Sequence, residues 1–113
     1  MVNATLTVAG RVIALDQDLY LAKLDDWSPE VAEHLAALEG IQLQAAHWEI
    51  IQAVQQFYQT FDLSPANRAL VKYIAQQLGK EKGNSLYLNS LFNGQPAKIV
   101  SRLAGLPKPA NCF

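Results

Sequence analysis

The chain has 113 residues, of which 50% are apolar and 17% are charged, with a formal net charge of −1. This length and composition favour one folded domain with its own core and exclude disorder of the whole chain. The apolar runs are too short for a membrane-spanning helix, and the single cysteine excludes an intramolecular disulfide. The first residues do not resemble a secretory signal, so we expect a cytoplasmic protein.

The charges are unevenly distributed along the chain. Residues 1–62 hold nine acidic and two basic residues, a net charge of −7, whereas residues 63–113 hold one acidic and seven basic residues, a net charge of +6. A basic face formed by the second half would suit an anionic partner, RNA included. Alternatively, folding mixes the two halves in space, and the sequence leaves both outcomes open.

The first 24 residues predict a small antiparallel β-meander. Leu6 and Val8 alternate with threonines, and Ala9-Gly10 then predicts a turn into a second strand that ends at Leu15. Residues 16–18 predict another turn, and residues 19–21 a short third strand.

About five helices are expected over residues 28–104. Ser-Pro pairs, a Gln-Pro pair and the onset of apolar periodicity mark the helix starts, and glycines mark the ends. The predicted starts are Ser28-Pro29, Ala45, Ser64-Pro65, Ser85 and Gln95-Pro96, and the predicted ends include Gly40, Gly79 and Gly105. No linker or repeat divides the chain, so we expect a single α+β domain over residues 1–113.

The second predicted helix carries an aromatic stripe. Ile50, Val54, Phe57, Tyr58 and Phe61 are spaced by three and four residues or lie side by side, so they share one helix face. A stripe of this kind is typical of a buried core rather than of a cofactor site.

Residues 105–113 are predicted to form an extended, mobile arm. Pro107 and Pro109 each remove a backbone donor and disfavour helical geometry in the preceding residue. Nine residues at about 3 Å each reach on the order of 25 Å. Gly105, at the base of the arm, is the expected hinge.

The only cysteine, Cys112, is the penultimate residue of this arm. A thiol there is exposed rather than part of a packed core, and it is either inert or used. Nearby cations favour the reactive thiolate, so Lys108 and Arg102 are candidates for stabilising it or for guiding docking. The terminal carboxylate of Phe113 opposes this effect, and both cations are also consistent with solvated surface charge.

The sequence shows no other catalytic constellation. His34 and His47 are thirteen residues apart, which is not a metal-ligand spacing, and His47 fits a packing or capping role. Glycine-rich phosphate loops and nucleophile motifs are absent. We therefore expect no cofactor and no metal, and a single thiol suited to carrying a group.

The sequence resembles the TusE/DsrC family of sulfur-relay proteins over nearly its whole length. The matching stretches include Glu39-Gly40-Ile41, His47-Trp48-Glu49, Ser64-Pro65-Ala66, Lys82-Gly83-Asn84-Ser85 and the block from Ala104 to Pro109 followed by Cys112. The resemblance implies a β-meander packed on helices with a mobile C-terminal arm. It also implies that Cys112 accepts sulfur as a persulfide and passes it on.

The resemblance further separates two branches of the family. In the DsrC branch a second cysteine lies eleven positions before the first, and here that position is Ser101. The TusE-like role is therefore favoured, with sulfur taken from a TusBCD-type complex and delivered to an MnmA-type thiouridylase with bound tRNA. The resemblance thus implies a sulfurtransferase that acts as a persulfide carrier only together with partner proteins, while the acceptor enzyme completes 2-thiouridine in tRNA. It implies no membrane partner.

Two alternatives remain open at this point. One is a DsrC-like sulfur carrier in dissimilatory sulfur metabolism. The other is a nucleic-acid-binding regulator, because residues 66–92 predict two helices joined by a short glycine-containing connection with basic residues nearby. Direct contact with nucleic acid is an open question under each hypothesis.

Overall fold

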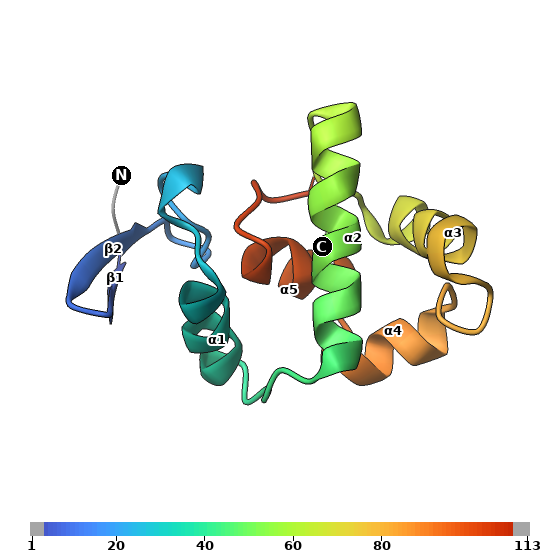
Figure 1. The fold of residues 1–113 in the computed structure, drawn as a ribbon, viewed down its shortest axis with the longest axis horizontal. Helices are drawn as coiled ribbons and strands as arrows, with labels where there is room; N and C mark the ends of the chain where they lie inside the picture. Colours follow the sequence, from blue (N-terminus) through green and yellow to red (C-terminus); the bar gives the residue numbers. More distant parts are fainter. Residues whose placement is uncertain (1–3, 110–113) are drawn as a thin grey trace.

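The computed structural model describes residues 4–109, and the Cα atoms have a radius of gyration of 13.3 Å. Two strands, a 3-10 turn and five α-helices follow one another in this part of the chain. They are β1 (Ala4–Val8), β2 (Arg11–Leu15), the 3-10 helix (Leu24–Asp26), α1 (Pro29–Leu38), α2 (Ala45–Phe61), α3 (Asn67–Leu78), α4 (Ser85–Leu91) and α5 (Pro96–Leu103). The hairpin lies at one end of the molecule, α3 and α4 lie at the other, and α5 lies between them (Figure 1). The α+β prediction is thereby confirmed.

The β-hairpin has the predicted two-residue turn. Ala9 and Gly10 have φ angles of 51° and 79°, the positive pair that a type I′ turn requires. The expected third strand is reduced to a single bridge between Leu15 and Leu21. Leu19, with φ of 66°, interrupts the extended backbone just before that bridge, so a longer ladder cannot form.

Helix α1 begins and ends as the sequence predicts. The Ser28 Oγ accepts a hydrogen bond from the Val31 backbone N–H at 3.2 Å, and Pro29 occupies the first helical position. Gly40 follows the C-cap with φ of 71°, a conformation that glycine adopts without a Cβ penalty.

The predicted start of α3 is wrong. The helix begins at Asn67, and its N-cap is Ala66 rather than Ser64. The Ser64 hydroxyl instead donates a hydrogen bond to the Pro107 carbonyl at 2.5 Å, far along the chain. The Ser64 side chain, which the local sequence predicts to be a helix cap, therefore makes a tertiary contact instead.

The aromatic stripe of α2 is buried over most of its length. Ile50 and Val54 are inaccessible and Phe57 is 8% exposed, but Tyr58 is half-buried and Phe61 is 52% exposed. The expectation that Phe61 belongs to the core is wrong, because it occupies the last position of the helix. Its ring still packs against that of Phe57, with a centroid separation of 4.6 Å.

Helix α5 forms the centre of the helical array. It contacts each of the other four α-helices, and Ile99, Val100 and Leu103 are at most 2% exposed. The residues that follow α5 therefore leave from the middle of the core rather than from its edge. None of the helices among residues 4–109 is both long and apolar enough to cross a membrane.

Candidate functional site

The C-terminal segment is fixed at the point where it leaves α5. The Leu106 N–H donates to the Ser101 carbonyl at 2.9 Å, and the Gly105 N–H donates to the Arg102 carbonyl at 3.1 Å. Together with the positive φ of 77° at Gly105, these two bonds form a Schellman motif. The glycine therefore serves as a helix terminator.

Trp27 closes over the same turn. Its indole Nε1–H donates to the Leu103 carbonyl at 2.8 Å. A Cβ placed on Gly105 would lie 2.5 Å from the Trp27 Cδ1, so glycine is required by packing as well as by backbone angle. Gly105, the expected hinge, is here the C′ residue of a capped helix, and movement about it would have to break the two capping hydrogen bonds.

Further contacts hold the residues on both sides of Gly105. Before it, the Gln55 side-chain amide donates to the Ala104 carbonyl at 3.1 Å, and after it, the Ser64 hydroxyl donates to the Pro107 carbonyl. Leu106 is 6% exposed and belongs to the main hydrophobic cluster. In the described part of the predicted arm, Leu106 and Pro109 are buried whereas Pro107 and Lys108 are exposed, so the segment is anchored to the core at its start.

Lys108 lies at the surface of this docked segment. Its Nζ is 3.3 Å from the Asp18 Oδ2, and the two side chains are 47% and 38% exposed. An exposed pair at this distance contributes little to stability and is readily exchanged. Lys108 is therefore a cation that remains accessible four residues before Cys112.

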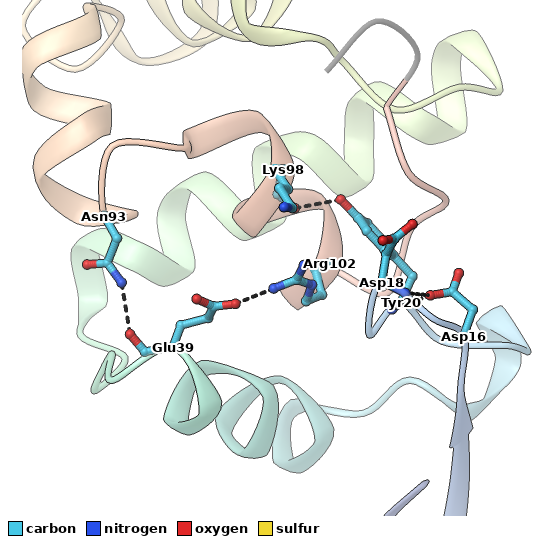
Figure 2. A network of polar contacts seen from close by, with 7 residues as sticks. All are labelled: Asp16, Asp18, Tyr20, Glu39, Asn93, Lys98 and Arg102. Carbon is cyan, nitrogen blue, oxygen red and sulfur yellow. Dashed lines mark hydrogen bonds and ion pairs between the residues drawn. The ribbon is translucent and has the colours of Figure 1, made fainter. Parts of the chain in front are cut away.

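Arg102 is buried, so the interpretation of this residue as solvated surface charge is wrong. Its guanidinium forms an ion pair with Glu39 and lies over the Tyr20 ring, 5.2 Å from the centroid (Figure 2). The Arg102 side chain is 7% exposed and that of Glu39 is 26% exposed. The Arg102 guanidinium therefore links the C-terminal ends of α1 and α5.

A polar network extends from this ion pair to three neighbouring segments. The Asn93 amide donates to the Glu39 carbonyl at 2.8 Å, and the Tyr20 hydroxyl donates to the Lys98 carbonyl at 3.0 Å (Figure 2). The Tyr20 N–H in turn donates to the Asp16 Oδ1 at 3.0 Å. The network ties the loop after β2 to α5 and fixes the base of the C-terminal segment.

His47 has the capping role that the sequence suggests. Its Nδ1 accepts a hydrogen bond from the Gln44 N–H at 3.0 Å, so the proton is on Nε2, which donates to the Leu91 carbonyl at 3.1 Å. These two bonds engage both ring nitrogens and join the start of α2 to the end of α4. Across residues 4–109, no three His, Cys, Asp or Glu side chains gather as they would around a metal.

One exposed ion pair shifts a pKa. The Lys82 Nζ lies 2.7 Å from the Glu49 Oε1, and this hydrogen bond raises the pKa of Lys82 above its usual 10.5 against a smaller desolvation effect. The pair joins α2 to the connection between α3 and α4.

The predicted nucleophile, Cys112, lies outside the described residues, as does the chain from residue 110 onward. Ser101 is described and is wholly buried on α5. Its Oγ finds no hydrogen-bond partner among residues 4–109. The structure thus defines the segment that leads toward Cys112 as far as Pro109, with Lys108 at its surface and Arg102 buried on α5.

Sequence reasoning missed the residues that anchor this segment and the helix before it. Trp27, Gln55, Ser64 and Tyr20 contact backbone groups that lie 43 to 78 positions away along the chain. No local pattern encodes such contacts. The only available signal was Gly105, whose requirement for positive φ indicates a fixed turn as readily as a hinge.

Comparison with known proteins identifies the family. The family model described as DsrC like protein matches residues 7–113. The chain belongs to the DsrC-like family. Among its curated relatives, Sulfurtransferase TusE of Yersinia pestis is 50% identical and the Sulfurtransferase TusE homolog of Haemophilus influenzae is 49% identical. Each match covers 108 residues, 96% of this chain and 99% of the relative.

Solved structures of DsrC-like proteins share the fold. DsrC of Allochromatium vinosum is 44% identical, with a TM-score of 0.88 and full coverage of both chains. The oxidized gamma-subunit of the dissimilatory sulfite reductase (DsrC) from Archaeoglobus fulgidus is 32% identical, with a TM-score of 0.81 over 97% of this chain and 100% of that one. For this DsrC-like protein, the likenesses support sulfur transfer as the general activity.

Proposed function

We propose that this protein is a TusE-type sulfur carrier in which Cys112 accepts a sulfur atom and relays it for 2-thiouridine formation in tRNA. The observation that carries the proposal is Ser101, a buried serine at the position where the DsrC branch has its second cysteine. A hydroxyl cannot bind a sulfane sulfur, so a carrier with one thiol must pass its cargo between proteins. The TusE names of relatives about half identical to this chain support the same role.

The transfer step is a thiol exchange that needs no added oxidant. The Cys112 thiolate attacks the outer sulfur of a donor persulfide, a new S–S bond forms, and the donor S–S bond breaks. The donor leaves as a thiolate, and Cys112 becomes the persulfide. The rate depends on the thiolate fraction, on the leaving-group pKa and on access to the thiol. The donor in this proposal is a TusBCD-type complex and the acceptor an MnmA-type thiouridylase with bound tRNA.

Packing of the C-terminal segment limits where this exchange takes place. Cys112 is only three residues beyond Pro109, the last described residue, which is buried. Three extended residues span at most about 10 Å, compared with about 25 Å for a free nine-residue arm. Both partners must therefore bring their cysteines close to the docked segment, unless binding first undocks Leu106 and Pro107.

Of the two candidate cations, we propose that only Lys108 assists the thiolate. Its ammonium is exposed and shares a single 3.3 Å contact with Asp18, whereas Arg102 is buried against Glu39. Lys108→Gln should lower the rate of persulfide formation and move its pH dependence upward, because a cation favours thiolate. Asp18→Asn, which releases the ammonium, should not slow it. Equal rates for wild type and Lys108→Gln at every pH would contradict this role.

The DsrC-like alternative rests on the fold likeness to DsrC proteins. A carrier of that type would use two thiols, and Ser101 removes one of them. The alternative makes a different prediction, since the Ser101→Cys variant would then gain a second sulfur-binding thiol and a function that wild type lacks.

The test is intact-protein mass spectrometry after incubation with a cysteine desulfurase and its relay proteins. Wild type should gain one sulfur atom that a reductant removes, and Cys112→Ser should gain none while retaining its circular dichroism spectrum. Transfer is then followed as 2-thiouridine in tRNA after adding the thiouridylase. If wild type gains sulfur but no 2-thiouridine forms, the carrier chemistry stands and the tRNA assignment is overturned. If Cys112→Ser also gains sulfur, the carrier role of Cys112 and the tRNA assignment are both overturned.

A further inference from the structure

Folding neutralises part of the charge asymmetry between the two halves of the sequence. Every ion pair found among residues 4–109 joins an acid from the first half to a base from the second. These pairs are Asp18–Lys108, Glu39–Arg102 and Glu49–Lys82. The interpretation that folding mixes the halves is therefore confirmed for three of the seven basic residues of the second half. The bases left over identify any surface with unbalanced positive charge.

Two of the remaining bases line one cleft. Arg68 and Lys72 are exposed, lie one turn apart on α3, and have no acidic partner in the described range. The cleft, about 620 Å³ in volume, is lined by residues of α3, α4 and the start of α5. Helices α3 and α4 lie at the end of the molecule opposite the hairpin (Figure 1). The lining of the cleft holds no carboxylate: Asn67, Arg68, Val71, Lys72, Ser85, Asn89, Gly94 and Pro96.

The two cations work against the local stability of α3. Like charges four residues apart on a helix repel one another, and no acid on the cleft wall offsets that repulsion. A bound anion would remove this cost. The other lining groups suit the same ligand, because hydroxyl and amide side chains such as Ser85 and Asn89 commonly contact phosphate oxygens alongside Arg and Lys.

We propose that this cleft binds the phosphate backbone of RNA. Its composition favours a nucleic-acid strand over an acidic protein surface, since protein interfaces depend on aromatic and aliphatic anchors, and here Val71 and Pro96 are the main apolar lining. The absence of aromatic rings from this lining also predicts little stacking on bases, so binding should be independent of sequence. The inference rests on the proposed function only in naming tRNA as the RNA, because the charge and lining of the cleft are observed independently of any role of Cys112.

The experiment measures fluorescence anisotropy of a labelled, unmodified tRNA transcript with the full chain at 50 and 200 mM salt. The test variant is Arg68→Gln/Lys72→Gln. The matched control is Lys23→Gln/Lys80→Gln, which removes two exposed cations that lie outside the cleft and form no ion pair within residues 4–109. Two phosphate contacts correspond to a salt slope of about −1.8, or roughly a tenfold change in affinity over this fourfold salt range. The affinity of wild type and of the control for tRNA should therefore fall about tenfold more over this salt range than the affinity of the test variant.

Further measurements separate this inference from the sulfur-carrier proposal. The charge-preserving variant Arg68→Lys/Lys72→Arg should bind tRNA like wild type, and the glutamine double variant should still accept sulfur on Cys112. Absence of tRNA binding by wild type at 50 mM salt, or equal weakening by both glutamine double variants, would overturn the cleft assignment without touching the carrier chemistry. Tighter binding to duplex DNA than to tRNA would overturn it in favour of a regulator. If the Arg68→Gln/Lys72→Gln variant binds tRNA normally but no longer binds the thiouridylase in the absence of RNA, the cleft would be reassigned to a protein partner.

Discussion

Replacing Gly105 by alanine should destabilise the protein far more than the same change at Gly40. Both glycines follow a helix C-cap with similar φ angles, 77° and 71°. An alanine in this left-handed region costs roughly 1–2 kcal/mol, partly offset by a gain of about 0.4–1 kcal/mol from a less flexible unfolded chain. Backbone conformation alone therefore predicts a net loss of about 1 kcal/mol at each position.

The two sites differ in what surrounds the added methyl group. At Gly40 a Cβ would meet nothing within 4 Å, whereas at Gly105 it would lie 2.5 Å from the Trp27 Cδ1 and 2.8 Å from the Trp27 Cβ. Overpacking of this kind costs about 1–3 kcal/mol, because the indole cannot retreat without losing its bond to the Leu103 carbonyl. We expect a total loss of about 2–4 kcal/mol for Gly105→Ala.

Equilibrium urea unfolding, followed by circular dichroism, measures both losses. The double variant Trp27→Gly/Gly105→Ala completes a cycle in which the clash is absent, because Trp27→Gly removes the Cβ as well as the indole. In the Trp27→Gly background, the Gly105 substitution should cost only what Gly40→Ala costs. Equal losses for the two single alanine variants would refute the packing argument.

Three further predictions follow from the described contacts. Gly83→Ala should cost more than about 3 kcal/mol in urea unfolding, since its Cβ would lie 2.2 Å from a backbone nitrogen of α3, which has no rotamer to change. Glu39→Ala should cost about 2–4 kcal/mol and exceed Arg102→Met, because the first leaves a buried guanidinium without its carboxylate and the second leaves a carboxylate that reaches water. Lys82→Gln should lower the melting temperature at neutral pH; since the pKa of Lys82 is raised in the folded state, the difference should persist up to pH 10.5 and vanish as the pH rises through that folded-state pKa.

Each of these predictions has an outcome that contradicts it. A Gly83→Ala protein as stable as wild type would show that the connection after α3 moves away freely. A larger loss for Arg102→Met than for Glu39→Ala would mean that stacking on Tyr20, rather than the ion pair, dominates at that site. A Lys82→Gln difference that grows above pH 10.5 would reverse the sign expected for a stabilised ammonium.

Local sequence was sufficient wherever a structure depends on neighbouring residues. Ser28 and Gly40 mark the limits of α1, and Ala9-Gly10 forms the turn that joins β1 to β2. These features follow from capping bonds and backbone angles within a few residues, which a short stretch of sequence encodes completely. The family resemblance and the position of Cys112 were likewise readable from sequence alone.

Local sequence failed where a distant group competes for the same side chain. Ser64 looks like a helix cap but binds Pro107, and Arg102 looks like a surface cation but is buried between Glu39 and Tyr20. In both cases the competing partner is more than 35 positions away. Its proximity results from packing rather than from spacing.

The sequence by itself determined the α+β composition, most helix limits, the single thiol and the DsrC-like family. Only the tertiary structure decided that the base of the C-terminal segment is packed against the core and that three ion pairs join acids of the first half to bases of the second. It alone also decided that Arg68 and Lys72 line one cleft whose lining holds no carboxylate. The physical reason is that hydrogen bonds and charges act across a few ångströms of space. The chain brings together groups that are tens of residues apart only after its core has formed.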